Sequence, residues 1–240
     1  MRAFRTLALL SCLVLCGCLE IEQTITLKAD GSGTQTVKMD LRDSLIKELR
    51  QRQPAARLGE SGDPTAVFYE QKTRTELTAA GLELTAHKVE QKGGHRTVDL
   101  TASFGDFETL RKSPLCGSSA EWELVEGPKR GLAKLTLYPQ GKVAWQQARA
   151  RAAKMQDQLD PVAEEFFRKR QAQLKGLDVA FRFRVPGKVL VWTKNMEKVS
   201  DHEVLARVTA SQIKTPKDLV RRLAPRYELI FDARGTELFE

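Results

Sequence analysis

Runs in which apolar and polar residues alternate constrain the fold of this chain more than any other feature of its sequence. Residues 19–27 alternate in this way, the turn cluster Asp30-Gly31-Ser32-Gly33 follows, and residues 34–41 alternate again. Side chains along a strand point to opposite faces in turn, and Asp-Gly is a strong hairpin signal. We therefore predict a hairpin with one buried face. Residues 82–90 and 96–104 predict a second hairpin for the same reason.

The rest of the chain mixes strand patterns with helical ones. Further strands are predicted at residues 120–125, 132–138, 179–185, 189–192, 204–208 and 227–231. Helical spacing of apolar residues predicts helices at residues 42–53, 65–80, 107–112 and 217–223, with Gly81 ending the second. Residues 143–175 are rich in strong helix formers and are divided by Pro161.

These elements predict an α+β fold, in which a mostly antiparallel sheet packs against helices and a long helical segment is inserted before the C-terminal strands. The strands at 19–27, 34–41, 82–90, 96–104 and 179–185 are expected in one sheet, because isolated hairpins are marginal and their apolar faces must share a core. The helices that begin at Arg42 and Thr65 are expected to cover that face. The first half of segment 143–175 has fewer large apolar residues than the second, so we expect it to be the more exposed and mobile half.

The N-terminal residues are typical of a secretion signal that ends in a lipid attachment site. Arg2 and Arg5 precede an apolar run at residues 7–15, which is shorter than the about 20 residues that span a bilayer. The run ends in Leu15-Cys16-Gly17-Cys18, which resembles the lipobox of bacterial lipoproteins. We predict that Cys18 is lipidated after cleavage of the signal. The alternative is an ordinary secretion signal with an incidental cysteine.

The predicted lipid attachment site determines the expected domain bounds and the number of free cysteines. We predict a signal peptide at residues 1–17 and a single α+β envelope domain at residues 18–240, with a helical elaboration at about 143–175. Cys116 is then the one cysteine of the mature chain that carries no lipid, so no internal disulfide forms, and we expect a buried thiol.

Charge and motifs exclude several functional classes. The formal net charge of +8 suits a protein near anionic lipid headgroups or envelope glycans, whereas nucleic acid is a poor partner for an exported chain. His87, His95 and His202 stand apart, without the spacing of a zinc site. Ser44-Leu45-Ile46-Lys47 matches the S-x-x-K of penicillin-recognising enzymes, but the partner motifs are missing. We expect no metal, no cofactor and no enzymatic activity.

Two stretches resemble a known family. Cys18-Leu19-Glu20-Ile21-Glu22, with the Asp30-Gly31-Ser32-Gly33 turn, is similar to the start of the LppM-type lipoprotein domain. Residues 181–189, with Pro186-Gly187, resemble the aromatic strand of that family. The resemblance implies a lipid-binding, START-like sheet-and-helix domain in the cell envelope, which in the best-known member is associated with mannosylated phosphatidylinositols. It implies no catalytic signature. The chain departs from that member in its polar residues 232–240, where a transmembrane helix would stand, and in its segment 143–175.

Two surfaces are candidate binding sites. An apolar stripe either lines a lipid pocket between sheet and helices or forms a plain core; its residues are Phe181, Phe183, Val185, Val189 and Val191. The basic residues of segment 143–175 either lie on an anionic membrane surface or form a solvated helix face.

The sequence thus predicts a lipid-anchored, non-enzymatic envelope lipoprotein that binds a lipid, a glycolipid or another envelope component. Its predicted partners are the membrane, reached through the N-terminal lipid, and such a ligand. A protein-interaction module of a membrane-associated assembly, with no small ligand, is the alternative. Leu19 rather than Asp follows Cys18, which favours the periplasmic side of the outer membrane in a host with two membranes.

Overall fold

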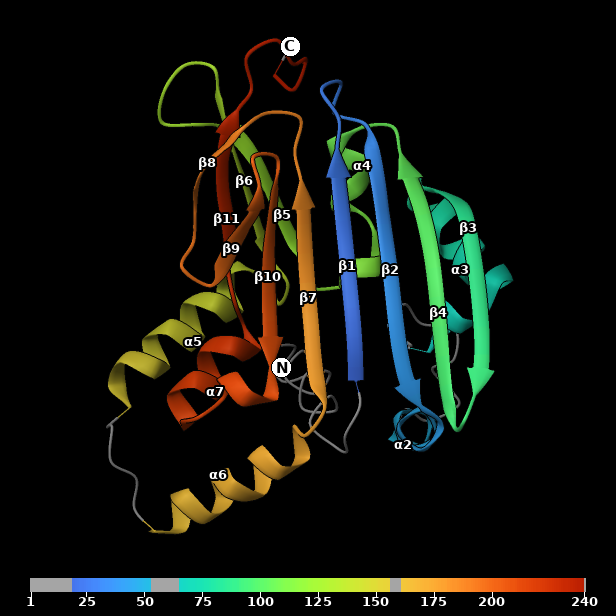
Figure 1. The fold of residues 1–240 in the computed structure, drawn as a ribbon, viewed down its shortest axis with the longest axis vertical. Coiled ribbons are helices and arrows are strands. Elements are labelled where there is room, and N and C mark those ends of the chain that lie inside the picture. Colours follow the sequence, from blue (N-terminus) through green and yellow to red (C-terminus); the bar gives the residue numbers. More distant parts are fainter. Residues whose placement is uncertain (1–18, 53–64, 156–160, 240) are drawn as a thin grey trace.

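Two β-sheets, flanked by helices, make up the structure (Figure 1). The computed structural model describes residues 19–52, 65–155 and 161–239, so Cys18 and the predicted signal peptide lie outside the described residues. The larger sheet has the strand order β3 (Glu83–Lys92), β4 (His95–Phe104), β2 (Gly33–Arg42), β1 (Leu19–Leu27), β7 (Leu177–Arg184), β10 (Glu203–Thr209), β9 (Met196–Ser200). The smaller has the order β5 (Glu121–Glu126), β6 (Leu132–Tyr138), β11 (Tyr227–Asp232), β8 (Val189–Trp192). This architecture confirms the predicted α+β class.

Strand β1 lies in the middle of the seven-stranded sheet. It pairs antiparallel with β2, which places Leu19 opposite Leu41, and parallel with β7, which places Leu19 opposite Leu177. The five strands predicted to share a sheet, β1 to β4 and β7, all lie in it. That prediction is confirmed. The sheet also has an edge strand, β9, that the alternation of residues does not predict. A side-chain hydrogen bond between β1 and β7 joins Glu22 and Arg182, which are 160 positions apart in the chain.

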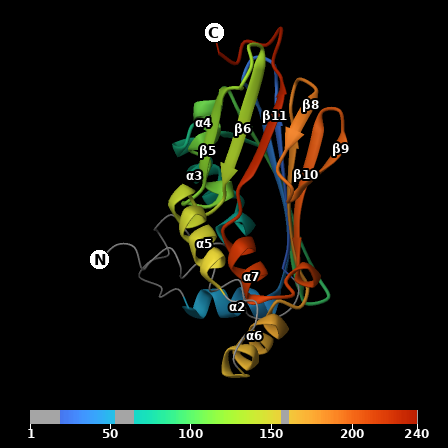
Figure 2. The same ribbon diagram turned by 90° about the vertical axis from the view of Figure 1, so that its left-hand side faces the viewer.

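The helices gather behind the larger sheet and at the end where β1 begins (Figures 1 and 2). They are α2 (Asp43–Arg52), η2 (Ala66–Phe68), α3 (Glu70–Ala79), α4 (Phe107–Arg111), η3 (Pro114–Cys116), α5 (Lys142–Lys154), α6 (Pro161–Gln173), η4 (Ala210–Gln212) and α7 (Pro216–Leu223). The prediction of one continuous helix at residues 65–80 is wrong. Its chain is extended at Tyr69, with φ −118° and ψ 104°, so a short 3₁₀ turn precedes α3. Gly81, at φ +87°, ends α3 as predicted.

The core lies between the two sheets. Ile25, Val37 and Phe183 from the large sheet are buried together with Leu135 and Phe231 from the small one. The expectation that helices cover this whole face is therefore wrong. Helix α3 packs on β3, but the small sheet covers β7. The physical reason is that β6 and β11 also have one apolar face each, and two such sheets bury both faces by stacking.

A polar cluster sits inside this core and fixes the turn at η3. Gln23 donates to the carbonyl oxygen of Leu115 at 2.6 Å, and Ser113 donates to Gln35 Oε1 at 2.5 Å. The Cys116 thiol donates to Gln23 Oε1 at 3.1 Å and accepts from Gln35 Nε2 at 3.0 Å. Cys116 is buried, which confirms the predicted buried thiol, and burial raises its pKa to about 12.

The helical segment before β7 is split into α5 and α6, and residues 156–160 between them lie outside the described residues. Helix α5 buries one residue, Ala152, so this half is exposed. It is not the more exposed half, because Phe167 is likewise the one buried residue among those described in α6. The mobility of α5 stays a prediction. Helix α6 packs Phe167 into a small second cluster with Val208 and Ile213. Within the described residues, no helix has the length and apolar content needed to cross a membrane.

Candidate functional site

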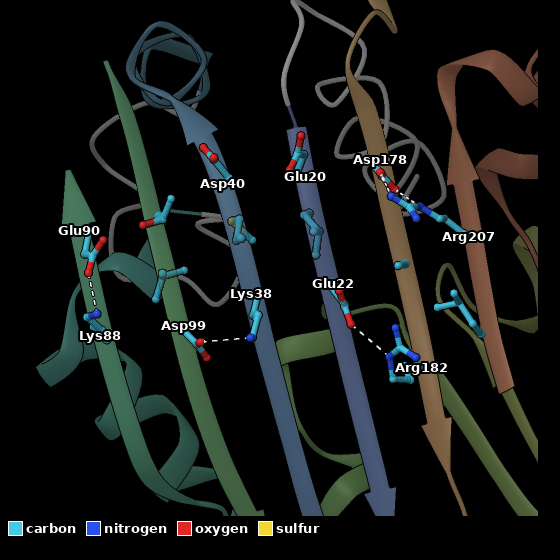
Figure 3. A pocket seen from close by; sticks show the side chains of 16 residues that line it. Glu20, Glu22, Lys38, Asp40, Lys88, Glu90, Asp99, Asp178, Arg182 and Arg207 are labelled. Atoms are coloured by element: carbon cyan, nitrogen blue, oxygen red, sulfur yellow. Dashed lines mark hydrogen bonds and ion pairs between the residues drawn. The ribbon is translucent and has the colours of Figure 1, made fainter. Parts of the chain in front are cut away.

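An open groove of about 470 Å³ lies on the outer face of the seven-stranded sheet, near the end at which β1 begins (Figure 3). Ile25 and Phe183 point into the core. Side chains alternate along a strand, so the even-numbered residues of β1 and β7 point outward. The charged side chains that line the groove are Glu20, Glu22, Lys38, Asp40, Lys88, Glu90, Asp99, Asp178, Arg182 and Arg207.

Three carboxylates form a row across the groove. The strand register places Glu20 opposite Asp40 on β2 and opposite Asp178 on β7, and neighbouring strands lie about 4.8 Å apart. Asp40 pairs with His95 at 2.8 Å, and Asp178 accepts a hydrogen bond from Arg207 Nε at 2.8 Å. Glu20 has no salt bridge within the part of the chain that the structure describes. The middle of the row is therefore an acidic position without a direct ion pair, and its charge contributes to the raised pKa of Arg207.

Arginine side chains tie together the strands next to this row. Arg182 on β7 contacts Glu22 on β1 at 3.1 Å and also pairs with Glu203 on β10. Arg184 contacts the same Glu203 at 2.7 Å. Burial raises the pKa of Glu203, but the hydrogen bonds from Arg184 and Arg182 outweigh it and hold that pKa below its ordinary value. The carboxylate of Glu203 is thus ionised and held in place at neutral pH.

The remaining lining residues are two further ion pairs and several aliphatic residues. Lys38 pairs with Asp99 at 3.5 Å, and Lys88 pairs with Glu90 at 2.6 Å. The aliphatic lining residues are Ile21, Met39, Val98, Ala180 and Leu205. Such a surface can accept hydrogen bonds from hydroxyl or ammonium groups, while apolar parts of a ligand contact Ala180 and Leu205 on the outward face. Among the described residues, no group of three or more His, Cys, Asp or Glu is arranged to hold a metal ion.

The residues of the predicted apolar stripe do not line this groove. Phe181, Phe183, Val185 and Val189 are buried between the sheets. The Phe183 ring lies 6.2 Å from that of Trp122 and 6.3 Å from that of Tyr227. The space predicted to hold a ligand between sheet and helices is thus occupied here by side chains of the small sheet.

Val191 departs from the predicted stripe, because it is 55% exposed while its neighbour Val189 is buried. Strand β8 is an edge strand, and its register against β11 shifts between Ile230 and Phe231. The predicted stripe places Val191 on the same apolar face as Val189, but the edge position leaves Val191 open to solvent.

Sequence reasoning missed the groove, although part of its signal was present. The alternation of residues 19–27 places Glu20 and Glu22 on the face opposite the core. Their partners Asp178 and Arg182 come from β7. Only the parallel β1–β7 pairing brings these groups together, and no local pattern specifies that pairing.

Comparison with known proteins gives a distant structural likeness. No family model matches the chain, and a search of curated proteins finds no match. Among solved structures, the chain is similar to the NMR structure of the folded domain of LppM from Mycobacterium tuberculosis. The similarity covers 91% of this chain and 91% of that chain, with 10% sequence identity and a TM-score of 0.44. At these values it is a distant structural similarity, which assigns no ligand and no residue role.

Proposed function

We propose that this chain is a lipid-anchored, non-enzymatic lipoprotein of the bacterial cell envelope, and that its groove binds the polar part of an envelope component such as a glycolipid headgroup. One observation carries the proposal. The groove, with its row of Glu20, Asp40 and Asp178, begins at the first residues of β1. That strand starts immediately after the predicted lipid attachment site, Cys18.

The short distance between anchor and groove supports a ligand at the membrane surface. Glu20 is two residues beyond Cys18, and an extended chain advances about 3.5 Å per residue. The edge of the groove is therefore within about 7 Å of the lipidated residue. A polar group that projects from the bilayer can reach Glu20 without any movement of the domain.

The packing of the core supports binding on the outer face. The aromatic side chains of β7 contact Trp122 and Tyr227 rather than an open cavity. The outer groove combines many charged side chains with the small apolar surface of Ala180 and Leu205, a combination that suits a headgroup better than a buried acyl chain.

The proposal includes a location. In a host with two membranes, the residue after Cys18, Leu19, favours the periplasmic side of the outer membrane. Separation of the membranes on a density gradient tests this point. The full chain is expected with outer-membrane markers, and its recovery with inner-membrane markers would contradict this location.

Native mass spectrometry of the full chain, extracted from its own membranes in mild detergent, tests the groove. We expect a bound component with the wild type and its loss from the double variant Glu20→Gln/Asp40→Asn. The control Glu164→Gln/Glu165→Gln removes two charges from exposed positions of α6 and is expected to keep the component. A bound mass retained by the groove variant, or absent from the wild type, would refute the proposal.

A second candidate function is a protein-interaction module, and exposed aliphatic side chains favour it. Leu190 and Val191 on β8 and Val199 on β9 are 45%, 55% and 50% exposed. Both strands are sheet edges, whose free backbone groups can pair with another chain. Photo-crosslinking from Val199 in cells tests this. A discrete protein adduct that is absent when the crosslinker is placed at Lys72, on α3, is the expected result for this function.

A further inference from the structure

A second groove, of about 300 Å³, lies where α5 and α7 meet the turn between β8 and β9. It is lined by Trp145 and three arginines, Arg149, Arg221 and Arg226. Figure 2 shows α5 and α7 in the layer of the small sheet, whereas the polar groove described above is on the outer face of the large one. The two grooves are therefore separate.

Local structure fixes these side chains around the indole ring. The guanidinium of Arg226 lies 4.9 Å from the ring centroid of Trp145, and that of Arg149, one turn further along α5, lies 5.8 Å from it. Both distances are within the range of cation–π attraction. Trp145 itself packs against Tyr138, with ring centroids 5.6 Å apart.

The neighbouring segments hold the other walls in place. Helix α7 begins with a capping box between Thr215 and Asp218 and carries Arg221 in its last turn. The turn after β8 is fastened to the chain before β11, because Asn195 Nδ2 donates to the carbonyl oxygen of Arg226 at 3.0 Å. Arg226 thus approaches Trp145 from a fixed backbone position, and Arg221 lines the same groove from α7.

The groove carries an excess of positive charge. Arg226 pairs with Glu228 at 3.6 Å. Arg149 and Arg221 form no salt bridge with any carboxylate among the described residues. Three guanidinium groups therefore share one carboxylate. Arginines without a carboxylate partner favour the binding of an anionic ligand. The planar guanidinium can donate two parallel hydrogen bonds to a phosphate group.

We propose that this groove binds a phosphate group through Arg149, Arg221 and Arg226. The inference does not depend on the ligand proposed for the outer groove. The phosphate can come from a phospholipid headgroup or from a soluble phosphate ester. Helices α5 and α7 lie in the half of the molecule in which β1 begins (Figure 1), so the headgroups around the predicted anchor are within the same region.

The fluorescence of Trp145 reports binding directly. The full chain in nonionic detergent is titrated with inorganic phosphate and with glycerol phosphate, and the Trp145→Phe variant identifies the part of the signal that belongs to this residue. In a second arm, the chain is reconstituted in vesicles of phosphatidylcholine with or without phosphatidylglycerol. A Trp145 signal that changes with phosphatidylglycerol indicates the lipid source, whereas a signal that changes only with the soluble probes indicates the soluble one.

Charge variants decide whether the arginines are responsible. Arg149→Gln/Arg221→Gln is expected to weaken phosphate binding about tenfold or more, because it removes two charged donors. The control Arg151→Gln removes one positive charge from an exposed position of α5 outside the groove and is expected to bind as the wild type does. Arg149→Lys keeps the positive charge but cannot donate two parallel hydrogen bonds to one phosphate. Its phosphate affinity is expected to lie between those of the wild type and the double variant.

Two results would overturn the proposal. One is the absence of any change at Trp145 with every probe in both arms. The other is a control, Arg151→Gln, that weakens binding as much as the double variant, which would indicate general attraction by a positive surface. Matching thermal unfolding midpoints verify that each variant is folded. If the double variant unfolds, Arg149→Lys alone decides the question, and binding equal to that of the wild type would count against the proposal.

Discussion

Substitution of Phe183 by Ala tests whether the space between the two sheets is a packed core. Phe183 is 1% exposed, and its ring lies 6.2 Å from that of Trp122 and 6.3 Å from that of Tyr227. Truncation of a buried Phe costs about 3–5 kcal/mol, and each aromatic contact contributes about 0.5–1.5 kcal/mol beyond its buried area. We expect the free energy of unfolding to fall by about 4 kcal/mol.

For a domain of this size, each 1 kcal/mol lowers the midpoint of thermal unfolding by about 2–4 °C, so the midpoint should fall by about 8–16 °C. Near-ultraviolet circular dichroism of the full chain measures it, because Trp122 lies next to the substitution. Phe166→Ala, at a position that is 62% exposed on α6, is the matched control and should change stability by less than about 0.5 kcal/mol.

A cavity that normally holds a ligand would respond differently, because the neighbours of Phe183 would already lack close contacts on one side. If Phe183→Ala costs less than about 1 kcal/mol, the reasoning from a packed core is refuted. Should Phe183→Ala fail to fold, Phe183→Leu keeps most of the volume, and a loss of about 1.5 kcal/mol or less is expected for it.

Three further predictions concern single side chains. Cys18→Ser is expected to remain unprocessed or to leave the membrane fraction, and a processed form that stays membrane-bound at high salt would contradict the anchor. Glu203 has a pKa below its ordinary value of 4.5 in the folded chain. Its ionised carboxylate should therefore stabilise the fold fully above pH 4.5, and this contribution should be lost as the pH falls through the pKa of the folded chain. Urea unfolding at several pH values should therefore show Glu203→Gln less stable than the wild type at neutral pH and equal to it in acid. An equal difference at every pH would contradict this. Cys116 has a pKa of about 12 in the folded chain, so iodoacetamide should label it slowly at neutral pH and rapidly in urea, and fast labelling without urea would show that the thiol is accessible.

Hairpins and their shared sheet could be predicted from sequence because their signals are local. The Asp30-Gly31-Ser32-Gly33 turn sets β1 against β2, and alternation alone decides which face is buried. The argument that apolar faces must share a core was sufficient to place β7 in the same sheet. The same argument was not sufficient to identify what covers the core-facing side of that sheet. The alternating residues of β6 and β11 suit either an extension of the large sheet or a second sheet.

The candidate site was less predictable, for a related reason. Contacts such as Glu22 with Arg182 join residues 160 positions apart, so the outer-face network exists only after the strands have paired. The Trp145 groove likewise combines α5, α7 and the turn after β8. The charged residues of both sites are ones that an isolated strand or helix would present to water in any fold.

The central position of β1 has a mechanical consequence. A load transmitted through a lipid at Cys18 would act along the axis of β1, whereas the hydrogen bonds of β1 run across that axis to β2 on one side and β7 on the other. The load would be shared by the whole strand at once instead of opening one bond after another. We therefore expect that tension would draw the acyl chains out of the bilayer before it pulled β1 out of the sheet.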